Sequence, residues 1–209
     1  NIVIQTISSL RSVIGEMSRI VLKIVLMGDG AVGKTALRKN YFGLGFKKTY
    51  MATLGADFAV KTQKISYKGE RTIEFQIWDL AGQPRFENVR GAYYRGCKGG
   101  LLCFDISRRE TAENLEGWYR EAVKNSRKRN FPVVVVANKI DLRLEVENAL
   151  SHDEGLVFAE NLQKKNEDSI IRYIETSAKT GDNVVEAFEA IAIANLEQIE
   201  KKLGSIDSL

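Results

Sequence analysis

The sequence predicts an α/β fold of three layers, in which helices cover both faces of a mostly parallel sheet of about six strands, including one antiparallel hairpin strand. Stretches that favour strands alternate with stretches that favour helices, which is typical of parallel sheets. The run at residues 133–137 is continuously apolar, as in strands buried on both faces. A glycine-rich turn joins the first expected strand to the first expected helix. With 209 residues, 44% of them hydrophobic, the chain is long enough for one well-buried domain.

The expected elements follow one another in a regular order. Residues 20–27 are expected to form a buried strand and residues 34–44 a helix. Residues 57–67 and 71–78, joined by a turn, are expected to form an antiparallel hairpin. Further strands are expected at residues 100–106, 132–137 and 170–176, and further helices at residues 86–94, 111–126, 153–165 and 183–202. Because ligands of such sheets bind beyond the carboxyl ends of the strands, the residues after each strand form the candidate site.

The turn after the first strand, GDGAVGKT, has the pattern of a phosphate-binding loop, or P-loop. Its glycines let backbone N–H groups approach phosphate oxygens, its lysine reaches the outer phosphates, and its last hydroxyl binds Mg²⁺. The preceding strand and the following helix are the context that this motif requires, which disfavours a chance match to an ordinary tight turn. The residues expected to contact the nucleotide here are Gly28, Asp29, Gly30, Ala31, Val32, Gly33, Lys34, Thr35 and Ala36.

The second hairpin strand ends in a group suited to phosphate chemistry. Asp79 can hold Mg²⁺, and the N–H of Gly82 can bond a terminal phosphate. The amide of Gln83 both donates and accepts, so it can orient an attacking water, although alone it would be a polar loop residue. Thr53 could add a second hydroxyl to Mg²⁺ when a third phosphate draws its loop inward, which would be a switch. The expected metal ligands are Thr35, Thr53 and Asp79, and the expected catalytic residues are Lys34, Thr53, Gly82 and Gln83.

Two further motifs predict that the base is guanine. In Asn138-Lys139-Ile140-Asp141, the carboxylate can accept from guanine N1–H and N2–H₂, the asparagine amide can help to hold O6 and N7, and the lysine stem can cover the ring. After the last strand, the N–H of Ala178 can donate to O6 and reject the amino group of adenine. The expected base contacts are Asn138, Lys139, Asp141, Ser177, Ala178 and Lys179.

With these motifs in this order, the sequence resembles Ras-superfamily small GTPases from about residue 20 to residue 202, and the Rab group most closely. The Rab-like segments are residues 54–58, 74–78, 81–86, 93–96 and 104–107. The resemblance implies the three-layer P-loop NTPase fold of a G domain, binding of GTP and GDP with Mg²⁺, and slow hydrolysis of GTP. It also implies three kinds of partner: a guanine-nucleotide exchange factor, a GTPase-activating protein and effector proteins.

The resemblance assigns roles to several aromatic residues. Phe46 would stack on the guanine, Tyr50 would cover the nucleotide, and Phe58, Trp78 and Tyr93 would form the surface that effectors contact. Ordinary core packing is the alternative interpretation of the last three.

Three departures from the Rab pattern are visible. The P-loop is closer to that of the Rho group than to that of most Rab proteins, although Gly30 keeps the small residue that leaves room for an arginine finger. Pro84 stands where Rab proteins usually carry glutamate, which would stiffen the second switch and change its recognition by an activating protein. No cysteine lies near Leu209 to carry a prenyl group.

The composition limits the other possible partners. The net charge is +4, but the basic residues are scattered among 27 acidic ones, so no nucleic-acid partner is expected. Two cysteines are too few for a disulfide scaffold, which favours a cytoplasmic location, with peripheral membrane contact as an option.

The apolar residues near the two ends predict accessory helices. We expect an amphipathic helical extension at residues 1–18, a G domain at 19–202 and a tail at 203–209. The extension carries a heptad seam formed by Val3, Ile7, Leu10, Ile14, Met17 and Val21. It could cover the G domain itself, a partner helix or an anionic membrane, and membrane contact is expected only through it. A shorter stripe consists of Leu196, Ile199, Leu203 and Ile206, and we hypothesise that the two helices pack together or bind one partner.

The ends of the chain also bear on its setting. Because the first residue is Asn1 and not methionine, the sequence suggests a boundary within a longer protein. The G domain itself is expected to be monomeric.

Two rival functions remain open. One is a non-hydrolysing module that holds GTP to recruit partners, although the glutamine, the switch threonine and the acidic metal ligand of a hydrolase are all present. The other is an ATP-dependent kinase or transport ATPase, which the Asn-Lys-x-Asp motif opposes.

Overall fold

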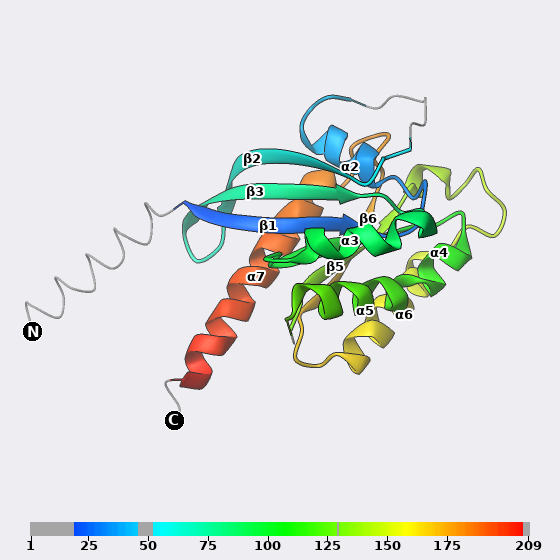
Figure 1. Cartoon of the computed structure of the whole chain (residues 1–209). Coiled ribbons are helices and arrows are strands. Elements are labelled where there is room, and N and C mark those ends of the chain that lie inside the picture. Colours follow the sequence, from blue (N-terminus) through cyan, green and yellow to red (C-terminus); the bar gives the residue numbers. More distant parts are fainter. Residues whose placement is uncertain (1–18, 46–51, 129, 207–209) are drawn as a thin grey trace, which may run out of the picture.

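The computed structural model of the chain describes residues 19–45, 52–128 and 130–206 (Figure 1). The expected extension at residues 1–18, the two expected nucleotide contacts Phe46 and Tyr50, and residues 207–209 lie outside the described residues. The structure leaves those predictions untested, except that Val21, the last residue of the expected heptad seam, lies in the strand Ile20–Met27 and not in a helix.

A six-stranded sheet forms the middle layer, with the strand order β2-β3-β1-β4-β5-β6. The strands are β1 (Ile20–Met27), β2 (Ala56–Ser66), β3 (Glu70–Leu80), β4 (Gly99–Asp105), β5 (Val133–Asn138) and β6 (Ile171–Thr176). The β2·β3 pair is antiparallel, and the other four pairs are parallel. The predicted fold class is therefore confirmed, including its one antiparallel strand.

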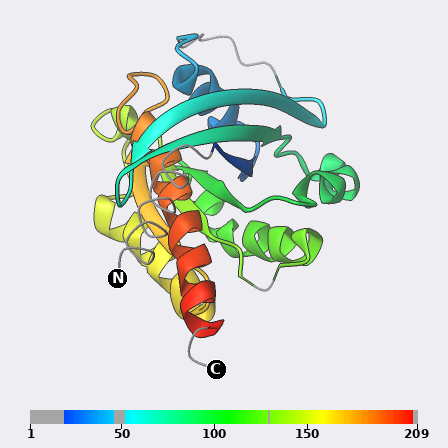
Figure 2. The ribbon, with the colours of Figure 1, turned by 90° about the vertical axis from the view of Figure 1, so that its left-hand side faces the viewer.

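Helices cover both faces of this sheet (Figures 1 and 2). They are α2 (Lys34–Tyr41), α3 (Glu87–Tyr94), α4 (Arg109–Glu113), α5 (Leu115–Ser126), α6 (His152–Lys165) and α7 (Val184–Ile206), with short 3₁₀ turns η1 (Pro84–Phe86) and η2 (Ile140–Leu142). One core cluster packs α2 and α7 against the sheet, and a second packs α3, α4, α5 and α6. Since β4 and β5 are buried along their whole length between the two clusters, their continuous apolar runs have the expected cause.

The helix bounds differ from the expected ones at three places. The helix α2 ends at Tyr41, because Gly43 follows with a left-handed φ of 74°. The helix expected at residues 111–126 is two helices that meet at Asn114, whose side chain bonds the P-loop.

The helix α7 continues to Ile206 and does not end near residue 202. Its later turns are held by polar contacts: Glu197 pairs with Arg172, and Glu200 accepts from Lys68 and Tyr67 in the hairpin turn. In the part of the chain that the structure describes, no helix has the length and apolar character needed to cross a membrane.

Candidate nucleotide-binding site

The predicted motifs meet at one edge of the sheet because they follow the carboxyl ends of parallel strands. The P-loop follows β1, and the segment beginning at Ala81 follows β3, the parallel neighbour of β1. The base motifs follow β5 and β6, which are also parallel neighbours. A sheet of this order therefore brings residues that are more than 100 positions apart into one site.

The P-loop depends on glycine at its last turn. Gly33 has a φ of 103°, and a Cβ added there would lie 2.1 Å from Nδ2 of Asn138. A residue with a side chain would thus be strained and would also displace Asn138. The loop then passes directly into α2, where Lys34 and Thr35 are the first residues.

Lys34 is a buried cation held by the loop itself. Its exposed fraction is 6%, and Nζ donates to the carbonyl oxygens of Gly28 (2.6 Å) and Asp29 (2.7 Å). Burial lowers the pKa of Lys34, although the charge of Asp79 raises it in part. Because desolvation disfavours the charged lysine, an anion at this loop would stabilise it. The loop therefore fits a phosphate group.

The three predicted metal ligands lie together. Thr35 Oγ1 donates to Asp79 Oδ2 over 2.5 Å and lies 3.0 Å from Thr53 Oγ1. Asp79 is fully buried, and its Oδ1 has no hydrogen-bond partner among the described residues. Burial raises the pKa of Asp79, while the bond from Thr35 and the charge of Lys34 act against that shift.

This arrangement fits a hard divalent cation. A buried carboxylate oxygen without a partner costs about 1–3 kcal/mol or more, which a bound cation would offset. No group of three or more His, Cys, Asp or Glu side chains suited to a metal occurs in the described ranges, so the candidate rests on one carboxylate and two hydroxyls. Mg²⁺ commonly uses few protein ligands together with water and phosphate oxygens.

The segment after β3 packs directly on the P-loop. A Cβ added at Gly82 would lie 2.4 Å from the carbonyl carbon of Asp29 and 2.5 Å from the nitrogen of Gly30. A Cβ added at Gly30 would lie 3.9 Å from Cγ of Gln83, so the Gln83 side chain lies beside the loop. The structure therefore brings the two predicted catalytic residues Gly82 and Gln83 to the phosphate site.

Asn138 has a structural role that the sequence did not predict. Its Nδ2 donates to the carbonyl oxygen of Val32 in the P-loop (2.8 Å), and its Oδ1 accepts from Thr176 Oγ1 and from the N–H of Ala178 (both 3.1 Å). We expected Asn138 and Ala178 to contact guanine. In this structure they bond each other, and Asn138 joins the phosphate loop to both base motifs.

The other base-motif residues also have partners within the chain. Asp141 Oδ1 accepts from Ser177 Oγ (2.6 Å), and its Oδ2 lies 3.3 Å from Lys179 Nζ. Lys139 donates to Asp105 Oδ2 (2.6 Å) from a backbone with a left-handed φ of 71°. All of the predicted base contacts therefore lie close together.

Two links to the P-loop were missed by the sequence reasoning. The first runs through Arg108, whose Nη2 donates to the carbonyl oxygen of Gly30 in the P-loop (2.9 Å). Arg108 also donates to the buried Asp105 at the end of β4. Asp105 accepts further bonds from Ser107 and Lys139. Burial alone would raise the pKa of Asp105, but the bonds from Lys139 and Ser107 outweigh it and lower that pKa. The segment that contains Asp105 was noticed only for its resemblance to Rab proteins.

The second missed link runs through the side chain of Asp29. Its carboxylate accepts from Trp118 Nε1 and from Asn114 Nδ2, both at 2.7 Å. The two donors come from the start of α5 and lie far from Asp29 in sequence, so no local pattern joins them.

The three aromatic residues expected at an effector surface are in contact. The ring centroids of Phe58 and Trp78 are 4.8 Å apart, and those of Trp78 and Tyr93 are 5.2 Å apart. Phe58 is 46% exposed, whereas Trp78 and Tyr93 are partly buried against the core. The group is thus both the edge of the core and an accessible aromatic surface.

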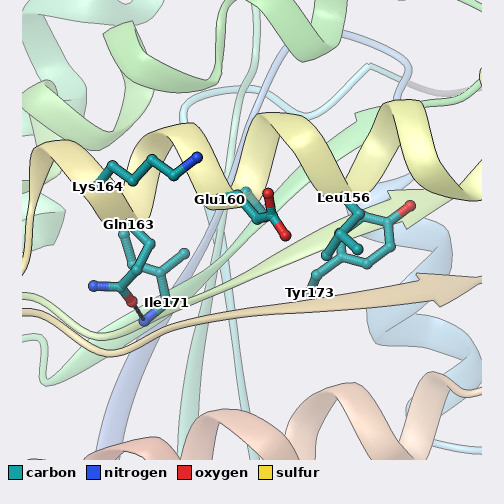
Figure 3. Close-up of a pocket in the computed structure, with 7 residues that line it drawn as sticks. Leu156, Glu160, Gln163, Lys164, Ile171 and Tyr173 are labelled. Carbon is teal, nitrogen blue, oxygen red and sulfur yellow. Dashed lines mark hydrogen bonds between the residues drawn. The ribbon is translucent and has the colours of Figure 1, made fainter.

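A cavity elsewhere in the molecule is separate from this site (Figure 3). It has a volume of about 230 Å³ and is lined by residues of α6 and β6, namely Leu156, Ala159, Glu160, Gln163, Lys164, Ile171 and Tyr173. None of these is a predicted site residue. The candidate site is therefore defined by the converging motifs and not by this cavity.

Comparisons with known proteins agree with the motifs. A family model described as the Ras family matches residues 23–197. Ras-related protein Rab-7a of Dictyostelium discoideum is 40% identical over 177 residues, covering 83% of this chain and 82% of that protein. Ras-related protein RABG3f of Arabidopsis thaliana is 37% identical over 187 residues, covering 88% and 86%. Ypt/Rab-type GTPase ypt7 of Schizosaccharomyces pombe is 35% identical over 182 residues, covering 86% and 84%.

Proposed function

This chain belongs to the Ras family and is a small GTPase similar to Rab proteins, and from that premise we propose that it is a guanine-nucleotide switch that hydrolyses GTP to GDP and phosphate at the P-loop. The observation that carries the proposal is the position of Gln83 beside Gly30, at the same loop that holds Lys34 and the Thr35–Asp79 pair.

Each residue of the site has its own role in phosphoryl transfer. Lys34 and the loop N–H groups stabilise negative charge on the phosphates, and Gln83 orients the attacking water. In the reaction, the water oxygen forms a bond to the γ-phosphorus as the bond to the β–γ bridging oxygen breaks. GDP keeps that electron pair, and the attacking water transfers a proton to a phosphate oxygen. Mg²⁺, held by Thr35, Thr53 and Asp79, would neutralise charge on the phosphate oxygens.

Thr53 supplies the switch in this proposal. It precedes β2 and contacts the P-loop helix through Thr35. In this proposal a third phosphate, with Mg²⁺, would hold Thr53 at this position, and its loss would release the segment. The neighbouring aromatic group Phe58, Trp78 and Tyr93 would then bind effectors in the GTP state. An exchange factor and an activating protein would set the populations of the GTP-bound and GDP-bound forms.

Guanine recognition in this proposal belongs to the base motifs. Asp141, positioned by Ser177 and Lys179, would accept from guanine, and Asn138 and Ala178 would line its O6 side. The similarity to Rab proteins supports a role in membrane trafficking, with the protein acting at the membrane surface.

Single-turnover hydrolysis of bound GTP tests the proposal. We expect slow loss of the γ-phosphate, which Gln83→Leu lowers at least about tenfold because the water loses its orienting amide. Gln76→Leu is the matched control, since Gln76 lies on β3 with Glu74 as its side-chain partner. Retention of GTP by all three proteins would favour the non-hydrolysing recruiting module instead.

A further inference from the structure

Arg90, on α3, is a buried arginine that no predicted motif uses. Its exposed fraction is 4%, whereas arginine is almost never this buried without partners. A buried guanidinium is stable only when its donors are bonded, so its partners show what it holds in place.

The guanidinium bridges a helix and the catalytic segment. Its Nε and Nη2 donate to the two carboxylate oxygens of Glu121 on α5, over 2.8 and 2.7 Å. Its Nη1 donates to the carbonyl oxygens of Gln83 (3.1 Å) and Ala81 (3.4 Å). Arg90 therefore connects the backbone around Gly82 to α5.

The helix α5 also holds the P-loop. Trp118, three residues before Glu121 on α5, has its ring 4.3 Å from the guanidinium carbon of Arg90. Its Nε1 donates to Asp29 of the P-loop. The face of α5 that carries Trp118 and Glu121 is thus a common anchor for the phosphate loop and for the segment that carries Gln83.

We infer that Arg90 is a positioning residue for GTP hydrolysis, which fixes the backbone of Ala81 and Gln83 against the P-loop through its anchor on α5. This inference rests on the proposed function, because it acts through Gln83. The two bonded carbonyls lie on either side of Gly82, whose backbone packs on Asp29 and Gly30. Holding both carbonyls sets the point from which the Gln83 side chain reaches into the site.

Lysine could not replace Arg90 in this role. The fork of arginine serves a carboxylate and two carbonyls from fixed directions, whereas the single nitrogen of lysine cannot reach both sides. Arg90→Lys keeps the charge and removes the fork. It is therefore the informative substitution.

A double-mutant cycle with Gln83 tests the inference. Single-turnover hydrolysis is measured for the unchanged protein, Arg90→Lys, Gln83→Leu and the double variant. We expect Arg90→Lys to lower hydrolysis about tenfold, since small displacements of a catalytic group have effects of this size or larger. GDP dissociation should change by less than about twofold, and the double variant should be no slower than Gln83→Leu alone.

A second readout does not depend on activity. Hydrogen exchange of peptides covering residues 80–94 in the GDP-bound protein should be at least about fivefold faster in Arg90→Lys, because two carbonyls lose their fixed partner. Arg172→Lys is the control, since Arg172 forms an arginine–glutamate pair with Glu197 between β6 and α7, outside the motifs. That variant should change neither hydrolysis nor exchange in this segment.

The possible outcomes separate the two claims. If Gln83→Leu leaves hydrolysis unchanged, the proposed function fails. If Gln83→Leu is slow but Arg90→Lys hydrolyses normally, or if the two losses multiply, the role of Arg90 is overturned. Should Arg90→Lys not fold, Glu121→Gln is used, because it weakens the same anchor while preserving side-chain size. Glu121→Gln is then expected to lower hydrolysis by less than Arg90→Lys would, again without adding to the effect of Gln83→Leu. Unchanged hydrolysis in Glu121→Gln would reject the inference.

Discussion

The phosphate end and the base end of the site differ in how well their buried polar groups are satisfied within the chain. At the phosphate end, a buried ammonium bonds two carbonyls and a buried carboxylate has an oxygen without a partner among the described residues. At the base end, Asn138 makes three bonds to other parts of the chain, and Asp141 has two partners. The difference indicates that the charged groups Lys34 and Asp79 at the phosphate end gain stability from a bound ligand, whereas the base end is assembled by the fold.

The largest effect is expected from Lys34→Met. Removing the ammonium should weaken GDP binding by at least about 100-fold, equivalent to about 2.7 kcal/mol. The nucleotide-free protein should lose little stability, because the cost of burying the ammonium offsets the loss of its two carbonyl bonds and of its attraction to Asp79. Equilibrium binding and denaturant unfolding measure the two quantities.

Lys39→Met is the control for that substitution. Lys39 lies on the same helix, α2, and should show neither effect. Strong loss of stability in nucleotide-free Lys34→Met would contradict the contrast, because it would mean that the chain alone already stabilises the buried ammonium of Lys34.

Asn138→Ala should have an effect of the opposite kind, on the stability of the nucleotide-free protein. It leaves the carbonyl of Val32, the hydroxyl of Thr176 and the N–H of Ala178 without their shared partner. The free energy of unfolding of the nucleotide-free protein should fall by about 2–4 kcal/mol, as measured in urea. An unchanged stability would show that the base end is not held together by Asn138.

The smallest effect concerns Asp105 and pH. Its bonds to Lys139 and Ser107 lower the pKa of Asp105 below the ordinary value of 3.8. A lowered carboxyl pKa stabilises the fold fully above that ordinary value, and this stabilisation is lost as the pH falls toward the folded-state pKa. Unfolding measured between about pH 5 and pH 3 should therefore show a steeper loss of stability for the unchanged protein than for Asp105→Asn. Parallel curves would contradict this assignment.

The motifs of the site could be predicted from the sequence, but the links between them could not, for a physical reason. The positions of the P-loop, Asp79 and Gln83 were predictable because each lies at or just after the end of a strand, and a parallel sheet brings its strand ends to one edge. The links between motifs were not predictable. Asn138 bonds Val32 and Trp118 bonds Asp29 across about 100 residues of sequence, and only the packing of helices on the sheet sets these distances.

The helices show the same division between features that a local pattern reveals and contacts that it does not. The capping box at Ser151 and Glu154 marks the start of α6 in the sequence itself, and the structure contains both of its hydrogen bonds. The later turns of α7 contact β6 through Glu197 and the turn between β2 and β3 through Glu200, and no local pattern reveals these partners. Arg90 is a similar case, because its helix alone gives no sign that it bonds Glu121.

Hydrogen exchange before and after addition of Mg²⁺ and GDP tests the contrast between the two ends most directly. In the nucleotide-free protein, amides at the ends of β5 and β6 should already be protected, while those of residues 28–33 and 82–83 exchange quickly. The nucleotide should slow exchange at the phosphate end by at least about tenfold and at the base-end strands by less than about twofold. Either of two results would contradict this contrast between the ends. One is equal protection of both ends by the nucleotide, and the other is fast exchange at both ends in its absence.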